Sequence, residues 1–363
     1  MSNWFSVDKA GLAAVLERRG KAFALFELVQ NAWDSGAERV SVTLTPIPGQ
    51  AYAQLEIDDN GEGFADLSHA HTMFARSTRA DDAEKRGRFN LGEKLVLSVC
   101  RWAAIETTSG TLEFCNTGNL RRGSDKRESG TRFVAEIKMT RDEYGECCEA
   151  MRRLIPPVAT TFNGAEIERP DSIARFDTKL PTEIADADGL LRRTTRLGTV
   201  EVYEGNGELL ELGIPVCETT NGYRVNVLQK VPLNMERDNV TPAFLRTIQA
   251  ALLNNVHDRL SPEEASMPWA QEAAGDARAT PAAVKAVIKA RFGERAVVAT
   301  PNDPMANAAA EAAGFTVIPG GSLSADAWAN IRKHNLLLPA SQVFPTPKPE
   351  ALANATRCPM CGR

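Results

Sequence analysis

The most regular pattern of apolar and polar positions lies between Lys21 and Val40, in the sequence KAFALFELVQNAWDSGAERV. At 3.6 residues per turn its apolar side chains share one broad face, which predicts an amphipathic helix. Glu27, Asn31 and Asp34 stand at positions i, i+4 and i+7 and form a polar stripe on the other side. A solvated helix face is the ordinary explanation, but this stripe contains no lysine or arginine. It is therefore a candidate site.

Segments that alternate between apolar and polar residues follow this helix and predict half-buried strands. Because helices and strands are mixed along the first 156 residues, the pattern predicts an α+β fold. The expected strands are 39–44, 53–58, 103–108, 111–116 and 131–139, and the expected helices are 8–19, 67–75 and 93–100.

Two glycine-rich segments come after the second predicted strand. In the first, D-N-G-x-G, Asp59 is followed by Gly61 and Gly63, which allow a ligand to approach the backbone closely. The second, GRFNLGEK, begins at Gly87 and leads into a predicted helix, where exposed N–H groups can bind phosphate oxygens. The polar, charged segment 76–86 between them is typical of a mobile lid.

The ordered set E-x-x-x-N-A-x-D, D-N-G-x-G and a glycine-rich lid resembles the GHKL ATPases, the superfamily of gyrase, the heat-shock-ninety chaperones, histidine kinases and MutL. The resemblance implies a Bergerat-type ATP-binding α/β sandwich that uses ATP and Mg²⁺. It makes Glu27 the general base for water, Asn31 the Mg²⁺ ligand and Asp59 the acceptor for the adenine amino group. The other nucleotide-binding residues that it implies are Asp34, Gly61, Gly63, Gly87, Asn90, Leu91, Gly92, Lys94 and Thr131.

Two of these assignments carry alternatives, and a third residue departs from the family pattern. Lys94 adds positive charge near the phosphates, or it is a solvated helix residue. Thr131 begins a strand similar to the one that closes the nucleotide pocket in this superfamily, where its hydroxyl supports the adenine-binding carboxylate; otherwise it is an ordinary β-branched strand residue. Asn90 stands where the family often has another glycine, a mild departure because asparagine tolerates positive φ.

A second region, 157–260, is expected to contain strands at 198–204 and 222–228 and a helix at 242–260. Between them, QKVPLNMERD resembles a segment of the heat-shock-ninety middle domain. The resemblance implies that Arg237 reaches the γ-phosphate of ATP and that Lys230, from a shortened Q-x-K switch loop, stabilises charge there. The alternative for Arg237 is a surface arginine at a helix start.

The resemblance covers about the first 260 residues, and composition divides the rest. Residues 261–280 are rich in alanine, proline and acids and are expected to be a linker. Residues 281–340 show a helix–strand–helix–strand–helix pattern without a recognisable catalytic set. The expected domains are therefore 1–156, which binds ATP, 157–260, which resembles a middle or transducer domain, the linker, the module 281–340 and a proline-rich tail, 341–363.

The tail contains Cys358 and Cys361 in a C-P-x-C-G sequence, which resembles the knuckle of zinc ribbons. A structural zinc site needs four ligands, and this spacing supplies two. His334 or a second subunit would have to supply the others, and the alternative is a mobile tail. The remaining cysteines are scattered, as is typical of a reducing compartment.

The formal net charge of −5 gives no overall electrostatic footprint for nucleic acid. No long apolar run is present, so the chain is expected to be cytoplasmic and not membrane-spanning.

The resemblance leaves three roles open. The first is a slow ATPase that acts as a chaperone-like clamp: ATP closes the lid, promotes homodimerisation and acts on a protein or DNA client. A similarity to the rIIA-like phage proteins in the lid sequence would connect this role to phage infection or defence. The second is a histidine-kinase-like phosphotransferase, which is disfavoured because the chain has four histidines and no upstream phosphoacceptor helix. The third is a nucleotide-binding regulatory module without significant turnover.

Overall fold

The computed structural model describes residues 8–72, 82–86, 92–115, 120–186, 191–234 and 239–346. The fold is a mixed α+β fold, as the sequence predicts. The chain forms two compact units, one made of Met1–Thr219 and Tyr223–Thr241 and the other of Thr220–Gly222 and Pro242–Arg363. The limits of the predicted functional domains within these units stay a prediction.

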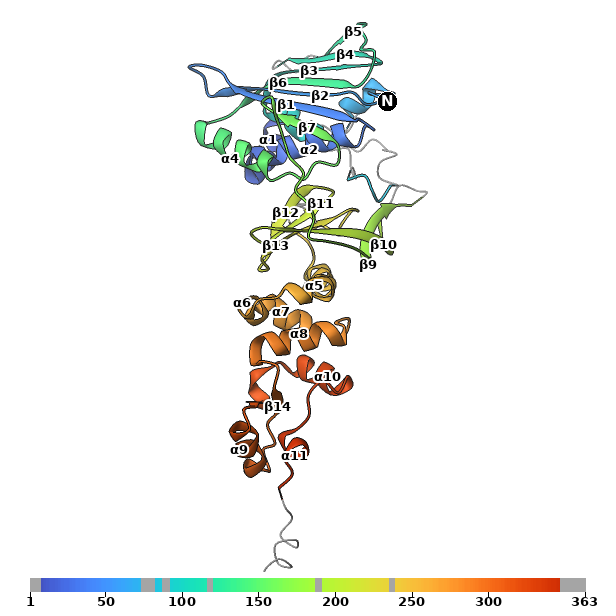
Figure 1. Ribbon diagram of the computed structural model, residues 1–363. Helices are drawn as coiled ribbons and strands as arrows, with labels where there is room; N and C mark the ends of the chain where they lie inside the picture. Colours follow the sequence, from blue (N-terminus) through green and yellow to red (C-terminus); the bar gives the residue numbers. More distant parts are fainter. Residues whose placement is uncertain are drawn as a thin grey trace, which may run out of the picture. The chain divides into compact units, whose positions relative to one another are not determined.

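The first unit contains an eight-stranded sheet in the order β5-β4-β3-β6-β2-β1-β7-β8. β1 and β7 pair in parallel, whereas the other neighbouring pairs are antiparallel. Figure 1 shows this sheet above α1, α2 and α4. The strands are β1 (Arg39–Pro46), β2 (Tyr52–Asp59), β3 (Cys100–Thr107), β4 (Gly110–Cys115), β5 (Leu120–Gly123), β6 (Thr131–Lys138), β7 (Ala159–Phe162) and β8 (Ala165–Glu166).

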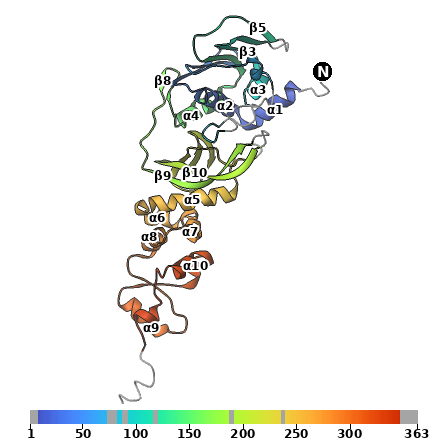
Figure 2. The ribbon, with the colours of Figure 1, turned by 90° about the vertical axis from the view of Figure 1, so that its right-hand side faces the viewer.

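Helix α2 covers one face of this sheet, and Figures 1 and 2 both show it against the strands. Its apolar face forms the core with inward side chains such as Leu25, Val29, Val42 and Leu55, which are fully buried. The helices of this region are α1 (Lys9–Arg19), α2 (Lys21–Trp33), α3 (Gly92–Val99) and α4 (Arg141–Arg152). The helix expected at 67–75 is wrong in extent, because the described residues form only a short 3₁₀ turn, η1 (Leu67–Ala70).

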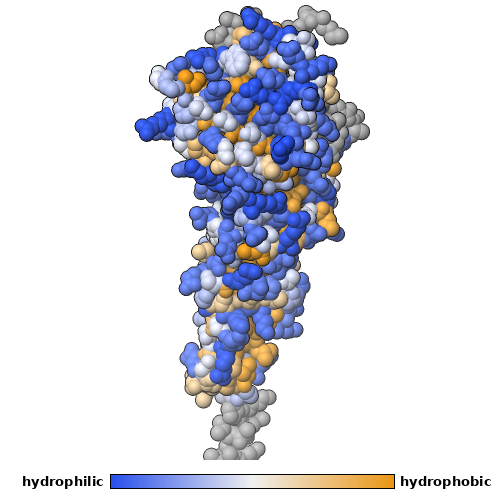
Figure 3. Space-filling view, turned by 45° about the horizontal axis from the view of Figure 1, so that its top comes forward, coloured by the Kyte–Doolittle hydropathy of each residue, from blue (hydrophilic) through white to orange (hydrophobic). Residues whose placement is uncertain are grey.

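The other face of the sheet is polar, and hydrophilic side chains predominate over a few apolar patches where it comes into view in Figure 3. Arg132 on β6 forms ion pairs with Glu56 on β2 and Glu106 on β3. Because these charges stand on neighbouring strands, they keep this face solvated while they cross-link the strands. The alternation along β1 and β2 therefore separates the core from the solvent, as the sequence pattern predicts.

A second sheet, with the order β12-β11-β13-β10-β9, belongs to the same unit. It is tied to the first sheet near a turn: the Ile155 N–H donates to the Gly213 carbonyl over 2.9 Å, and Ile214 belongs to the core of the first sheet. The strands are β9 (Ala174–Ala185), β10 (Leu191–Glu204), β11 (Glu208–Glu211), β12 (Ile214–Glu218) and β13 (Tyr223–Val227).

The second unit is mainly helical. Its helix–strand–helix–strand–helix order from α8 to α10 is the one predicted for residues 281–340. β14 and β15 pair in parallel. The elements are α5 (Pro242–Val256), η3 (His257–Arg259), α6 (Pro262–Ser266), α7 (Pro268–Gly275), α8 (Pro281–Phe292), β14 (Ala296–Val298), α9 (Pro304–Ala312), β15 (Thr316–Ile318), η4 (Gly320–Ser322), α10 (Ala325–Lys333) and α11 (Ala340–Val343).

The linker expected at 261–280 is wrong, because this stretch forms the packed helices α6 and α7. Ser261 and Glu264 make a capping box at the start of α6, and a proline opens each helix. The Trp269 side chain on α7 is 1% exposed. The alanines therefore serve as packing residues and the prolines as first helical residues, which explains how a folded stretch acquires the composition of a linker.

Among the helices that the structure describes, none combines the length and apolar character needed to cross a membrane.

Candidate nucleotide-binding site

Asp59 closes β2 and places a carboxylate, only 5% exposed, at the end of the strand. Its Oδ1 accepts hydrogen bonds from Ser35 Oγ at 3.0 Å and from the Gly61 N–H at 2.9 Å. Burial raises the pKa of Asp59 above its ordinary value, and hydrogen bonds from Gly61, Ser35 and the Thr131 backbone N–H partly offset this. The carboxylate is thus fixed in orientation and, when ionised, has only acceptor capacity.

The glycines around this carboxylate are required by close contacts. A Cβ at Gly61 would lie 2.1 Å from Ser35 Oγ, and one at Gly130 would lie 1.7 Å from the Asp59 carbonyl oxygen. Gly63 has φ +78°, and a Cβ there would meet two threonine hydroxyls at the end of β3 at 2.5 and 2.7 Å. The D-N-G-x-G segment is therefore packed tightly between α2 and β3 and holds Asp59 in place.

Glu27 lies on α2, one turn before Asn31, and is 5% exposed. The first residue of α3, Gly92, lies directly against it: a Cβ at Gly92 would be 2.0 Å from Glu27 Oε2. The structure thus brings the carboxylate of the first motif to the start of the helix that follows the glycine-rich segment. These two segments are separated by more than sixty residues of sequence, and the contact joins them.

A small cavity lies between α2, β2 and β6, with a volume of about 30 Å³. Its lining brings Asn31 and Ser35 together with Asp59, Gly63 and Thr131. Four of these five residues, all except Ser35, belong to three separate motifs of the sequence. Its apolar walls are Leu28, Ala32, Ile57, Phe64 and Phe133.

Three other predicted residues have particular surroundings. Lys94 is 6% exposed, and its ammonium donates to the His69 carbonyl over 2.6 Å, so the alternative of a solvated helix residue is wrong. Lys230 is fully buried, and its backbone N–H donates to the Ala83 carbonyl over 2.7 Å. Asp34 follows the last turn of α2, where the Gln30 side-chain amide donates to it over 3.3 Å.

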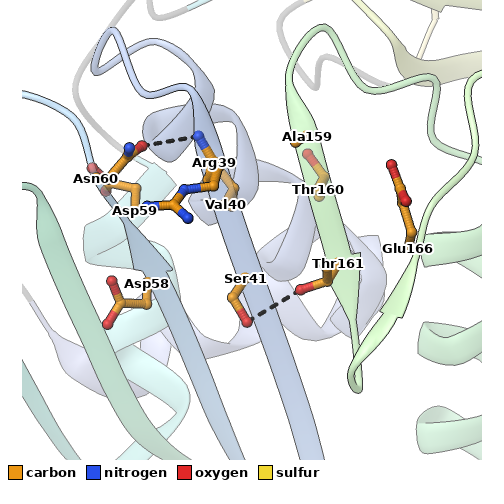
Figure 4. A pocket seen from close by; sticks show the side chains of 10 residues that line it. All are labelled: Arg39, Val40, Ser41, Asp58, Asp59, Asn60, Ala159, Thr160, Thr161 and Glu166. Carbon is orange, nitrogen blue, oxygen red and sulfur yellow. Dashed lines mark hydrogen bonds between the residues drawn. The ribbon is translucent and has the colours of Figure 1, made fainter.

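A larger cavity of about 420 Å³ opens at the edge of the sheet, between β1, β2 and the β7–β8 hairpin (Figure 4). It shares Asp59 with the small cavity, but several of its polar groups are already engaged. Asn60 accepts hydrogen bonds from the Glu38 and Arg39 N–H groups, and Asp58 pairs with Arg127 at 2.8 Å. The small cavity is the better candidate for nucleotide, since the predicted residues converge on it and not on the larger one.

Several predicted site residues lie outside the described residues, namely Gly87, Asn90, Leu91, Arg237, Cys358 and Cys361. Within the described ranges, no group of three or more His, Cys, Asp or Glu side chains is placed to hold a metal ion. This does not conflict with a magnesium role for Asn31, because Mg²⁺ is commonly held by one or two protein oxygens together with substrate phosphates.

Residues 22–141 match the family described as histidine kinase-, DNA gyrase B- and HSP90-like ATPase. Residues 22–141 therefore form a GHKL ATPase domain. Such domains in general bind ATP and Mg²⁺, and the buried carboxylate, the amide and the glycines around the small cavity fit that role. The domain spans α2 to β6 and so contains Glu27, Asn31, Asp59, Lys94 and Thr131.

The chain is also similar to the DNA mismatch repair protein MutL of Sphingopyxis alaskensis, at 31% identity over 170 residues. The match covers 41% of this chain and 27% of that relative, so the chain spans about a quarter of its length.

Two crystal structures share a general likeness. One is the N-terminal domain of a DNA repair protein, with a TM-score of 0.43 and 13% identity, over 66% of this chain and 93% of that one. The other is the ATPase region of Saccharomyces cerevisiae topoisomerase II, with a TM-score of 0.37 and 11% identity, over 54% and 62%.

Ser35 could not be found from the sequence; its hydroxyl, with one proton to donate, lies 2.7 Å from the Ala32 carbonyl oxygen and 3.0 Å from Asp59 Oδ1. A serine after a helix is common, and only its distance to β2 in the fold gives it this contact. Sequence reasoning also assigned the support of Asp59 to the Thr131 hydroxyl, whereas the contact found in the structure comes from the backbone of that residue. The hydroxyl role stays a prediction.

Proposed function

We propose that this chain binds ATP with Mg²⁺ at the small cavity, hydrolyses the bond between the β- and γ-phosphates, and uses the cycle as a molecular clamp. The observation that carries the proposal is the convergence of Asn31, Asp59, Gly63 and Thr131 on one cavity, with Glu27 one turn away on the same helix.

In this proposal, ionised Asp59 accepts a hydrogen bond from the adenine amino group. Ser35 and Gly61 fix the carboxylate before the base arrives, so little orientation has to be gained on binding. Selectivity for adenine over guanine follows, because a carbonyl at that position would face an acceptor and leave both groups unpaired.

Glu27 orients the attacking water and takes its proton, and Asn31 supplies an amide oxygen for Mg²⁺, which would neutralise phosphate charge when bound. Burial beside Gly92 confines the Glu27 carboxylate to one place at the start of α3. Lys230 and Arg237 are proposed to stabilise charge at the γ-phosphate.

A cavity of about 30 Å³ holds about one water molecule, so a purine base requires the lining to move. Phe64 is a good candidate for this movement, because it is only partly buried and follows Gly63 in the chain. Binding would then be coupled to a rearrangement of the D-N-G-x-G segment.

The clamp would act on a partner and close as an ATP-dependent homodimer. Because the curated relative is a mismatch repair protein, DNA is the partner we favour over a protein client. A role in phage infection or defence would be one setting for such a clamp.

Titration calorimetry with ATP and with GTP tests the binding step, and release of labelled phosphate from γ-labelled ATP tests hydrolysis. We expect magnesium-dependent ATP binding, slow release of phosphate and no label on the protein. Label retained on a histidine would replace the clamp with a phosphotransferase, and binding without release would make the chain a nucleotide-dependent regulatory module.

A further inference from the structure

Glu211, the last residue of β11, holds together two segments that are distant in sequence. Its Oε2 accepts a hydrogen bond from Arg86 Nε at 2.6 Å, and its Oε1 accepts one from the Val231 N–H at 2.8 Å. The Glu211 side chain is completely buried, and that of Arg86 is 3% exposed. One carboxylate thus binds the segment 82–86 with one oxygen and the loop 229–231 with the other.

One further contact joins the same two segments, and two others attach them to strands β9 and β10 of the second sheet. The Lys230 N–H donates to the Ala83 carbonyl over 2.7 Å, and the Lys230 carbonyl accepts from Thr182 Oγ1 over 2.8 Å. Arg196 on β10 pairs with Glu84 at 3.1 Å. The segment 82–86 had been expected to belong to a mobile lid, but its described residues are docked onto the second sheet.

The position of Arg86 in the chain gives this junction its importance. Five residues of sequence separate it from Gly92, which lies against Glu27. Fixing Arg86 to the second sheet therefore limits where α3 can begin. A buried ion pair adds little stability compared with an apolar pair of similar volume. The charged pair is accordingly better explained by the orientation that it imposes than by stability.

We propose that Glu211 is a positioning residue for nucleotide turnover: it couples the second sheet to the active site through Arg86 and the start of α3. This inference rests on the proposed ATPase function. Glu211 is not proposed to contact any reacting atom. It acts by holding Arg86, which limits the position of Gly92 against Glu27.

The same strand offers a matched control. Glu208, at the other end of β11, is also buried and accepts hydrogen bonds from Arg153 Nε at 2.9 Å and from Arg224 Nε at 3.0 Å. Arg153 is the C-cap of α4, so this pair also joins the second sheet to an element beside the first sheet, but far in sequence from the glycine-rich segment. A purely structural role would make Glu208 and Glu211 equivalent.

The experiment compares Glu211→Gln and Glu208→Gln in the full chain, with the multiple variants Arg86→Met/Glu211→Leu and Arg153→Met/Arg224→Met/Glu208→Leu. The multiple variants guard against misfolding, because they remove each carboxylate together with the arginines that pair with it. ATP affinity, turnover at saturating ATP and thermal midpoint are measured for each, together with amide hydrogen exchange of Lys230 without nucleotide.

We expect both Glu211 variants to bind ATP as the wild type does and to turn it over roughly 10- to 100-fold more slowly, the scale of a small misplacement of a catalytic group. Exchange of the Lys230 amide should accelerate, because the two segments separate more often without Glu211. The acceptor of this amide is the Ala83 carbonyl and not Glu211, so the change reports the contact between the segments. The Glu208 variants should keep the turnover of the wild type, and their Lys230 amide should exchange as slowly as it does in the wild type.

Equal loss of turnover in the Glu208 variants, or full turnover in the folded Arg86→Met/Glu211→Leu variant, would overturn the positioning role. Unchanged Lys230 exchange in the Glu211 variants would overturn it without reference to ATP. An absence of ATP hydrolysis by the wild type contradicts the proposed function instead, and the exchange measurement still decides whether Glu211 holds the two segments together.

Discussion

Gly92 and Glu27 are in direct contact: a methyl group added to Gly92 would lie 2.0 Å from Glu27 Oε2 and 2.8 Å from its carboxyl carbon. Gly92 is buried at the start of α3, and Glu27 is buried in the middle of α2. The glycine is therefore required here by the carboxylate that it faces, and the pair locks the end of the glycine-rich segment to the proposed general base.

Gly92→Ala should displace the Glu27 carboxylate, because the added Cβ cannot fit at this distance. We expect a loss of turnover of about 100-fold with smaller changes in ATP affinity, as for a misplaced catalytic group. Steady-state kinetics and calorimetry measure the two effects. Gly145→Ala is the matched control, since Gly145 also lies within a helix but has open space around its Cα. Equal damage from both substitutions would mean that the effect is on folding.

Glu27→Ala should keep ATP affinity and lose turnover by roughly 100-fold or more, since general-base contributions are of that order. Phosphate release and titration calorimetry measure the two quantities in one preparation. Glu38→Ala, at an exposed glutamate just beyond the same helix, should change neither. Turnover that persists in the Glu27 variant would place the base on another residue.

Asp59→Asn should abolish ATP binding, because the amide can present a donor where the adenine amino group needs an acceptor, and polar groups are left unpaired. Calorimetry with ATP at neutral pH checks this. Asp58→Asn is the control, because the Asp58 carboxylate, next to Asp59 in the chain, is only partly buried and pairs with Arg127. Unchanged ATP affinity in the Asp59 variant would mean that adenine does not bind in this cavity.

Ser35→Ala should shift the pH dependence of ATP affinity toward higher pH. Burial already raises the pKa of Asp59, and the Ser35 hydrogen bond is one of the contacts that lower it, so its loss raises the pKa further. A carboxyl whose pKa is raised on folding stabilises the fold below its unfolded pKa, and this contribution is lost as pH rises through the folded value.

ATP affinity has the opposite trend, because it needs the ionised acceptor and weakens as pH falls. Affinity measured against pH for the wild type, Ser35→Ala and Ser41→Ala gives the comparison, since Ser41 is exposed on β1. A Ser35→Ala profile that overlies the wild type would show that the hydroxyl does not support the Asp59 carboxylate.

The parts of the site that could be predicted are those in which one residue type is required by local geometry. The stripe of Glu27 and Asn31 follows from helical period, and Gly61 and Gly63 follow from close backbone packing. Ser35 and Glu211 could not be found in this way, because their partners stand on other elements. Such long-range contacts leave no local periodicity in the sequence.

The misassigned linker has a different cause. Its helix signals were present in the sequence, since Ser261 and Glu264 have capping-box spacing and Pro262 and Pro268 suit the first turn of a helix. Composition outweighed these local signals. The order of helices and strands from 281 to 340 was predicted correctly, because glycines and prolines there separate helices of strong period from short apolar strands.

The last prediction concerns Arg237, which lies outside the described residues and follows the loop that Glu211 binds. Arginine offers a planar fork of donors that suits phosphate oxygens better than lysine does. A contact to the γ-phosphate is made only with ATP, so Arg237→Ala should leave ADP affinity unchanged and lower turnover by roughly 10- to 1000-fold, the scale of losing one transition-state contact. Arg237→Lys should rescue little.

The full chain is the right material for this test. A fragment ending near Pro156 would lose the Ile214 side chain from the core of the first sheet and the Gly213 carbonyl that accepts from the Ile155 N–H. Slow turnover by such a fragment could then reflect a damaged fold. In the full chain, wild-type turnover in Arg237→Ala would make Arg237 a surface residue, and a loss of ADP affinity would place it in nucleotide binding, because only a γ-phosphate contact separates turnover from ADP binding.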